Sequence, residues 1–158
     1  MDITIRRAVP GDVDGIIRIL WQIAEVHRAG RPDICRAGVR KYSAVELEAL
    51  VRGEDPPAFV AADDTGNPVG CCLCTVRRYA GDKFLVDHTS LFIDDFGVDE
   101  TCRGQGVGTK LFAAAKEHAK HVGAYDIGLN VWEFNERAVR FYERCGFSPR
   151  NRHMEMIL

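Results

Sequence analysis

Apolar residues recur along the first third of the chain at the intervals of strands and helices. Residues 3–7 alternate between apolar and polar side chains, which predicts a first strand. Residues 12–28 carry apolar side chains at every third or fourth position, which predicts a helix with one face against a core. Ser43 and Glu46 have the spacing of a capping box, so a second helix is expected to start there and to end at Gly53.

The middle of the chain is predicted to form strands followed by a long helix. Residues 58–62 and 69–77 flank a segment rich in turn-forming residues, and we expect them to form an antiparallel hairpin. A third strand over 91–98 is interrupted by two aspartates. An apolar stripe over 111–122 then indicates a helix packed on the sheet.

The last part of the chain adds a strand, a helix and a final strand. Residues 127–132 are predicted as a strand, Asn135 as the cap of a helix that ends near Gly146, and 154–158 as the last strand. The order of elements predicts a mixed α/β (α+β) fold, with residues 1–158 forming a single domain. We expect about four helices around a mixed central sheet of six to seven strands, two of them parallel and connected by the long helix.

Composition excludes several classes of protein. At 158 residues and 46% apolar, the chain is long enough to bury roughly 70% of its unfolded surface. The net charge is −2 and the charges are interspersed, which argues against nucleic acid or an anionic membrane as a partner. No apolar run approaches the roughly 18 residues of a membrane span, and the N-terminal residues lack a signal-peptide core. A cytoplasmic protein is therefore expected.

The six cysteines show neither a disulfide framework nor a metal pattern. Cys71, Cys72 and Cys74 lie in a predicted strand, where a free cysteine packs as a small apolar residue. The histidines supply no H-x₃₋₅-H unit joined to a C-x₂₋₄-C pair, so no metal is expected. We predict that all six cysteines are free thiols.

A glycine-rich stretch over 103–110 separates the strand at 91–98 from the long helix. Gly104, Gly106 and Gly108 occupy alternate positions, and glycine lets the backbone adopt positive φ and approach a ligand closely. The first N–H groups of the helix lack intrahelical partners, and the helix dipole favours an anion there. The stretch contains no acidic residue that would neutralise the positive end of the helix dipole. The pattern predicts a site for phosphate or pyrophosphate.

Two other phosphate-binding loops fit this stretch less well. A Walker loop needs Gly-Lys-Ser/Thr in sequence, whereas Thr109 separates Gly108 from Lys110 here. A dinucleotide-binding fingerprint places its third glycine where this chain has Thr109. On this segment alone, a glycine-rich turn without a ligand is the remaining alternative.

Three features together resemble the GNAT superfamily of acetyl-coenzyme A (acetyl-CoA) dependent N-acetyltransferases. The strand over 91–98 that runs into Arg103-Gly-Gln-Gly-Val-Gly108 is similar to the family's (Arg/Gln)-x-x-Gly-x-(Gly/Ala) motif. Leu129-Asn-Val, followed by Asn135-Glu-Arg-Ala-Val-Arg-Phe-Tyr-Glu-Arg-Cys-Gly-Phe147, is similar to the family's Asn…Asn-x-x-Ala-x-x-Phe-Tyr-x-x-x-Gly-Phe block. The order and spacing of the preceding helices and hairpin agree as well.

The resemblance implies that two splayed parallel strands hold acetyl-CoA as the co-substrate. Unpaired backbone groups between such strands can bind the peptide-like pantetheine arm. The edge of the third strand would supply these groups, Asn130 and Asn135 would contact the arm or the pyrophosphate, and Tyr142 would lie near the thioester sulfur. The full set of implied cofactor contacts is Phe96, Gly97, Val98, Arg103, Gly104, Gln105, Gly106, Val107, Gly108, Thr109, Lys110, Asn130, Asn135 and Tyr142.

The implied reaction is direct attack of a primary amine on the thioester in a ternary complex. An alkylammonium with a pKa of about 10.4 must first lose a proton, which costs about 4–5 kcal/mol at pH 7. Asp94 and Asp95 interrupt an apolar strand beside the implied acyl site and are the candidate bases, with Asp94 acting through a water preferred. Strand alternation predicts Asp94 on the face of Phe96 and Asp95 on the other. The alternative for each aspartate is a solvated or substrate-binding carboxylate.

Tyr142 is the candidate acid for the departing thiolate. A phenol with a pKa of about 10 can donate a proton to a thiolate whose conjugate acid has a pKa of about 8.5. The alternative is an ordinary core aromatic next to Phe141. The backbone N–H of Phe96 or Val98 is the candidate for polarising the thioester carbonyl.

The acceptor is the least determined part of this hypothesis. The resemblance implies that the first interhelical loop, over 27–33, and the hairpin-side loop, over 78–88, roof the acceptor cleft. His27, Arg31 and Asp33 are therefore candidate substrate contacts. The nearby pair Asp94 and Asp95 favours a cationic amine over an acidic one. Small amines, amino acids, peptide N-termini, lysines and antibiotics all stay open as acceptors.

Other functions remain as alternatives. A non-catalytic acyl-CoA binding or sensing module would keep the glycine stretch without needing an acid or a base. A nucleotide-binding protein or kinase lacks its Gly-Lys-Ser/Thr sequence here. An acyl-cysteine intermediate on Cys102 or Cys145 has no neighbouring base in the sequence. Analogy with the family is compatible with a homodimer, for which the sequence shows no interface.

Overall fold

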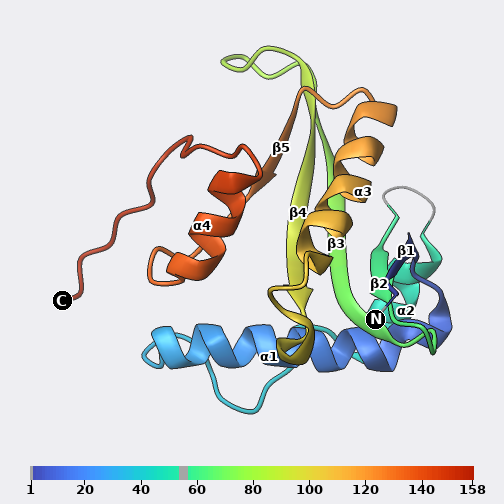
Figure 1. Ribbon diagram of the computed structural model, residues 1–158. Coiled ribbons are helices and arrows are strands. Elements are labelled where there is room, and N and C mark those ends of the chain that lie inside the picture. The colour runs from blue at the N-terminus through green and yellow to red at the C-terminus, as the bar shows by residue number, and fades with distance from the viewer. Residues whose placement is uncertain (1, 54–56) are drawn as a thin grey trace.

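The computed structural model describes residues 2–53 and 57–158, which form one mixed sheet with helices on both faces (Figure 1). The sheet has the strands β1 (Thr4–Arg7), β2 (Phe59–Ala62), β3 (Pro68–Tyr79), β4 (His88–Val98) and β5 (Asp126–Leu129). The α-helices are α1 (Val13–Gly30), α2 (Ala44–Arg52), α3 (Val107–His121) and α4 (Glu136–Arg144), and two short 3-10 helices are η1 (Pro10–Asp12) and η2 (Glu100–Cys102). None of the described helices combines the length and apolar character that crossing a bilayer requires.

Two helix starts have the predicted caps. The Ser43 hydroxyl accepts a hydrogen bond from the Glu46 N–H at 3.2 Å, and the Glu46 carboxylate accepts one from the Ser43 N–H at 2.7 Å. At α4 the Asn135 side chain accepts a hydrogen bond from the Ala138 N–H at 3.2 Å. Each cap satisfies a backbone donor that the first helical turn leaves unpaired, which confirms both predictions.

The strands lie in the order β1-β2-β3-β4-β5. The first three pairings are antiparallel, which confirms the predicted hairpin, and β4 and β5 are parallel, with α3 as their connection. The described residues thus form five strands rather than the predicted six to seven. The prediction of a last strand over 154–158 is wrong, because these residues have no strand beside them and an extended segment needs a paired neighbour.

Among the described residues, two of the three hydrophobic clusters hold helices on opposite faces of the sheet. Cys71 and Leu73 of β3 pack with α1 and α2, while Cys72 and Cys74 pack with α3 on the opposite face. This alternation confirms that the cysteines of this strand serve as small core residues. All six cysteines of the chain are free thiols, as predicted.

A β-bulge interrupts the pairing of β4 with β3 at Asp94. The register passes from the pair Leu73–Asp95 directly to the pair Cys74–Ile93, so Asp94 has no partner of its own in β3. An extra residue in one strand reverses the alternation of side chains beyond it. The bulge therefore decides which face each of the two aspartates occupies.

Both aspartates lie on the face that α1 and α2 cover. Asp94 accepts a hydrogen bond from Thr75 of β3 at 2.5 Å, and Asp95 accepts one from Tyr42 at 2.8 Å. Phe96 packs on the α3 side of the sheet. The prediction that Asp94 shares a face with Phe96 is therefore wrong, because a strict period of two does not continue through the bulge.

β4 and β5 separate soon after they pair. Their register covers Ser90 to Ile93 of β4 and Asp126 to Leu129 of β5, where β5 ends. β4 continues to Val98 with only β3 beside it, and Figure 1 shows the two strands diverging toward α1. The predicted splayed parallel pair is present.

The carboxylate of Asp99 ties the chain after β4 to α1. The side chain of Asp99 is 5% exposed and forms an ion pair with Arg18 at 3.1 Å. It accepts hydrogen bonds from Gln22 Nε2 and the Thr101 N–H at 3.1 and 3.0 Å. Gln22 Oε1 in turn accepts a hydrogen bond from the Glu100 N–H at 3.0 Å. Burial alone would raise the pKa of Asp99, but the hydrogen bonds from Thr101 and Gln22 and the charge of Arg18 hold it below its usual value.

Replacing this carboxylate is expected to destabilise the protein in a pH-dependent way. Asp99→Asn should lower the free energy of unfolding by about 1–3 kcal/mol at pH 7, because it removes charge-assisted hydrogen bonds from a buried site. Because the pKa of Asp99 is lower in the folded than in the unfolded protein, its carboxylate contributes fully to stability only above the unfolded-state pKa of 3.8. This contribution is lost as the pH falls through the folded-state pKa. Urea unfolding should therefore show a smaller difference from the parent at about pH 3 than at pH 7. Asp64→Asn at an exposed position is the control, and an equal loss at both pH values would contradict the assignment.

Candidate active site

A cavity of about 680 Å³ opens where β4 and β5 diverge. Its walls are the second half of β4, the glycine stretch before α3, the chain that follows β5, and one face of α4. The C-terminal half of α1 contributes the remaining side chains. Its volume lies within the roughly 300–1,000 Å³ of small-molecule sites.

The glycine stretch has the backbone conformation that an anion site requires. Gly104 and Gly106 have φ of 77° and 79°, a region that L side chains rarely occupy. Gly106 caps α3, and its carbonyl accepts the N–H of Lys110 at 3.1 Å. The preceding N–H groups of the first turn have no intrahelical partner, and this turn carries no acidic residue. Arg103 fixes the stretch to the end of β4 by donating a hydrogen bond from Nε to the Val98 carbonyl at 2.9 Å.

Most of the predicted cofactor residues line this one cavity. Gln105 and Lys110 are not part of its lining in the described chain: both side chains are exposed, and Gln105 Nε2 donates to the Thr101 carbonyl at 3.3 Å. The predicted residues that the fold brings together are Phe96, Gly97, Val98, Arg103, Gly104, Gly106, Val107, Gly108, Thr109, Asn130, Asn135 and Tyr142.

Asp94 and Asp95 also line the cavity, and both carboxylates have protein partners. The carboxylate of Asp95 accepts hydrogen bonds from Lys41 Nζ at 2.7 Å and from the Tyr42 hydroxyl at 2.8 Å. Burial lowers the pKa of Lys41, but the hydrogen bond and the charge of Asp95 outweigh it and raise that pKa above its usual value. Lys41 is therefore a cation at neutral pH, and the two aspartates stand in a cluster of mixed charge rather than an isolated acidic patch.

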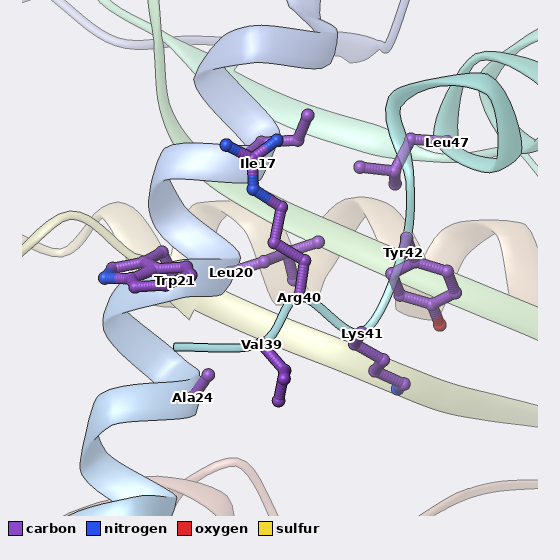
Figure 2. Close-up of a pocket in the computed structure, with 9 residues that line it drawn as sticks. All are labelled: Ile17, Leu20, Trp21, Ala24, Val39, Arg40, Lys41, Tyr42 and Leu47. Atoms are coloured by element: carbon purple, nitrogen blue, oxygen red, sulfur yellow. The ribbon is translucent and has the colours of Figure 1, made fainter. Parts of the chain in front are cut away.

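The segment 39–42 holds Lys41 and Tyr42 against α1. Figure 2 shows its side chains beside Leu20, Trp21 and Ala24 of α1, around a small pocket. That pocket has a volume of about 20 Å³, which is enough for roughly one water molecule. It is a packing gap rather than a second ligand site, and the packing fixes the two polar side chains that reach Asp95.

Tyr142 presents an unpaired hydroxyl to the cavity. Its ring lies against Phe96, Phe141 and Phe147, with centroids 6.2, 5.3 and 5.6 Å away. Burial raises the pKa of Tyr142 above its ordinary value, so the phenol stays protonated at neutral pH. Within residues 2–53 and 57–158 the hydroxyl has no hydrogen-bond partner, which leaves its proton available to a ligand.

The three predicted acceptor contacts fall into two groups. His27 lines the cavity, and its ring centroid lies 6.0 Å from that of Trp132. Burial lowers the pKa of His27 from 6.5, despite the opposing charge of Asp95, so the imidazole is largely neutral at pH 7. Arg31 and Asp33 are outside the cavity lining and form an ion pair with each other at 2.8 Å.

Several residues that line or support the cavity were not predicted from the sequence. Arg137 and Arg144 contribute to the cavity from α4, where their spacing with Phe141 places them on one helical face. That spacing was visible, but only the apolar residues of the helix were assigned. Lys41 and Tyr42 had no such signal, because they lie in a segment without periodicity and meet Asp95 only in the folded chain.

The described residues contain no group of three or more His, Cys, Asp or Glu side chains arranged to hold a metal ion.

Known proteins share this fold and its motifs. The family model described as "Acetyltransferase (GNAT) family" matches residues 18–147. Thialysine N-epsilon-acetyltransferase of Bos taurus is 28% identical over 148 residues, covering 91% of this chain and 83% of the relative. Peptidyl-lysine N-acetyltransferase YjaB of Escherichia coli is 35% identical over 109 residues, covering 68% and 61%. A solved structure of a tetramutant of the BH1408 protein from Bacillus halodurans has a TM-score of 0.93 at 30% identity, covering 98% and 99%.

The matched region contains both the glycine stretch before α3 and the block from Asn130 to Phe147, which are the segments that line the cavity. The chain therefore belongs to the GNAT acetyltransferase family and is an acyltransferase.

Proposed function

We propose that this protein transfers an acetyl group from acetyl-CoA to a primary amine by direct attack in a ternary complex. The observation that carries this proposal is the cavity between β4 and β5, where the start of α3, an unpaired phenol and two carboxylates meet. Residues 1–158 would act as one catalytic domain.

The glycine stretch supports acetyl-CoA as the co-substrate. The unpaired N–H groups at the start of α3 and the positive φ of Gly104 and Gly106 suit a pyrophosphate. Arg103, Arg137 and Arg144 line the same cavity and add positive charge for phosphate groups.

The free side of β4 supports binding of the pantetheine arm. Beyond Ile93 the strand pairs with β3 alone, so its other edge offers backbone groups to the cavity. A ligand with amide groups can pair with such an edge as an added strand does. We propose that Phe96 to Val98 bind the pantetheine amides, with Asn130 and Asn135 contacting the arm.

The proposed reaction needs a base that takes a proton from the acceptor amine and an acid that gives a proton to the thioester sulfur. The ammonium of the acceptor loses a proton to Asp94 through a water, and its nitrogen then forms a bond to the acetyl carbon. The carbon–sulfur bond of the thioester breaks, and Tyr142 donates a proton to the departing sulfur. The nitrogen loses its second proton as the amide forms, and this proton returns through water to the Tyr142 oxygen. Asp95, held by Lys41 and Tyr42, contributes a fixed negative charge near the acceptor.

We propose a cationic alkylamine of the lysine type as the acceptor. Asp94 and Asp95 favour a cation, and the neutral imidazole of His27 can accept a hydrogen bond from an ammonium group. Relatives named for acetylation of thialysine and peptidyl-lysine support the same class.

The six free cysteines suit a reducing compartment, which supports action in the cytoplasm.

An amine panel tests the activity directly. Purified protein with acetyl-CoA is assayed for release of free CoA thiol with thialysine, lysine, a lysine peptide, glucosamine-6-phosphate and no acceptor. Release should depend on the acceptor and be fastest with the cationic amines that carry no phosphate, because the two carboxylates attract them. Binding of acetyl-CoA without thiol release for any amine would show a non-catalytic acyl-CoA binding module instead.

The glycine stretch is tested by a pair of matched substitutions. Gly106→Ala and Gly66→Ala each force alanine into positive φ in open space, at φ of 79° and 87°, and each should cost about 1–2 kcal/mol of stability. Only Gly106→Ala should also raise the Kd of acetyl-CoA in calorimetry, by roughly tenfold or more, because it disturbs the backbone of the proposed pyrophosphate site. Equal Kd values for the two variants would remove the stretch from the binding site.

The role of Tyr142 is tested by removing its hydroxyl. Tyr142→Phe should lower kcat by roughly 10²-fold or more, since general acid catalysis typically contributes that much. The Kd of acetyl-CoA should change little, because the aromatic packing is kept. Tyr125→Phe, at an 84% exposed position, serves as the control. A Tyr142→Phe enzyme with the parent kcat would show that the hydroxyl is not the proton donor.

A further inference from the structure

The acceptor side of the cavity carries a lysine that the proposed reaction uses only to hold Asp95. Lys41 Nζ lies 2.7 Å from Asp95 Oδ2, and Asp95 lines the cavity, so the Lys41 ammonium stands at the border of the cavity. The Lys41 side chain is 53% exposed. A cation that served only in an ion pair would gain little at so exposed a position, because solvent screens such pairs. Its location beside the proposed acceptor site indicates a contact with the substrate.

The ammonium group of Lys41 has hydrogen-bond capacity left for a ligand. It carries three N–H donors. Its hydrogen bonds in the described chain go to Asp95 Oδ2 at 2.7 Å and to the Asp94 carbonyl at 3.5 Å, and the second is too long to be strong. With more than half of the side chain exposed, the ammonium can therefore take a further, anionic partner.

Asp95 offers a matching acceptor beside this donor. Both Lys41 and the Tyr42 hydroxyl donate to its Oδ2. Oδ1 of the same carboxylate accepts no hydrogen bond from the described residues and can accept one from a ligand. Lys41 and Asp95 thus place one positive and one negative group side by side at the cavity. This arrangement is complementary to the head of a free amino acid, whose ammonium and carboxylate groups are bonded to one carbon.

The position of the Lys41 ammonium is set by the chain around it. Segment 39–42 packs against α1, and Figure 2 shows the side chains of Lys41 and Tyr42 extending from it toward β4. Lys41 Nζ lies 5.0 Å from the centre of the Tyr42 ring, within the range of a cation–π contact. A preorganised cation loses little conformational entropy when a ligand carboxylate binds to it.

The charge of Lys41 also acts on the wall of the cavity. Burial lowers the pKa of His27, the charge of Asp95 opposes this shift, and the charge of Lys41 adds to it. His27 lines the cavity from α1. The Lys41 ammonium therefore lies close enough to the acceptor side to act on a ligand there.

Asp94 differs from Asp95 in the cation that accompanies it. Arg77 Nη2 lies 3.8 Å from Asp94 Oδ1, while the Arg77 guanidinium lies over the Phe92 ring, 3.3 Å from its centre. The ion pair of Asp94 is thus longer than the 2.7 Å pair of Lys41 with Asp95. Asp94 can therefore serve the reacting amine, while Asp95 and Lys41 together serve the rest of the acceptor.

We propose that Lys41 binds the carboxylate of the acceptor, and that the acceptor is a free amino acid of the lysine type. This role rests on the proposed acetylation of a cationic amine and narrows its substrate. The α-carboxylate pairs with Lys41 and the α-ammonium with Asp95 Oδ1, so each charge keeps an opposite partner, and the side-chain amine remains free to meet Asp94. A polyamine would instead place a further cation beside Lys41, and a lysine within a peptide has neither α charge.

Two acceptors that differ only in the carboxylate test this role. L-lysine and L-lysinamide share both amines, but the amide carries no negative charge. In the thiol-release assay with acetyl-CoA, the parent protein should show a kcat/KM for lysine roughly tenfold or more above that for lysinamide, because it gains one charge-assisted contact. Equal values for the two acceptors would overturn the role of Lys41.

Substitution of Lys41 shows whether this residue causes the preference. Lys41→Met removes the charge and should lower the ratio of the two kcat/KM values roughly tenfold or more, through the KM of lysine. Lys41→Arg keeps the charge and should keep most of the ratio. Lys120→Met is the matched control, because Lys120 is also an exposed lysine in an ion pair, with Glu117 at 2.6 Å, and is outside the cavity lining. A Lys41→Met protein that loses activity equally on both acceptors has lost only a structural contact, which contradicts the proposal.

Binding of lysine separates the role of Lys41 from the proposed catalysis. Calorimetry in the presence of CoA should show a Kd of lysine that rises roughly tenfold or more in Lys41→Met and keeps the parent value in Lys120→Met. This result without thiol release would refute acetyl transfer and still support an amino-acid site at Lys41. Thiol release with the same Kd of lysine in all three proteins would support the transfer and overturn the role of Lys41.

Discussion

The structure depends on the point at which β4 and β5 stop pairing. Up to Ile93 and Leu129 the two strands share hydrogen bonds, and beyond it β4 keeps its bonds to β3 while β5 ends. The separation leaves the second half of β4 with a partner on one side only, so a row of its backbone groups faces the cavity. In most proteins an unpaired buried backbone is destabilising. Here the same groups are the ones that a ligand with amides can satisfy.

The elements around the cavity between β4 and β5 are held in place by contacts outside the cavity. Asp99 anchors the turn after β4 to α1, and Arg103 ties the glycine stretch to the last carbonyl of β4. The start of α3 therefore has a set direction before any ligand binds. On the other side Phe96, Phe141 and Phe147 surround the ring of Tyr142, so its hydroxyl is placed by packing rather than by a hydrogen bond. A preorganised site of this kind loses little conformational entropy when it is occupied.

Local signals in the sequence predicted most of the fold. The caps at Ser43 and Asn135, the helical stripes and the hairpin each depend on residues close in sequence, and the structure contains all of them. The bulge at Asp94 could not be found in this way, since an extra residue is defined only by the register of the partner strand. Contacts such as Tyr42 with Asp95 likewise arise from packing between distant segments. The prediction of a strand over 154–158 is wrong because an alternating pattern is local, whereas a strand also requires a neighbouring strand to pair with.

The alternation of cysteines on β3 affects how the enzyme's chemistry can be followed. Burial raises the pKa of Cys71 to about 12, and the neighbouring Cys72 thiol is also held well above its usual pKa, chiefly by its contact with Cys74. Only the thiolate form of cysteine attacks disulfide dyes and mild oxidants. These buried thiols therefore react very slowly with such reagents while the sheet is folded. A colour reaction that reports thiols can therefore register the coenzyme A that the proposed reaction would release, against a background set by the less buried Cys35 and Cys145.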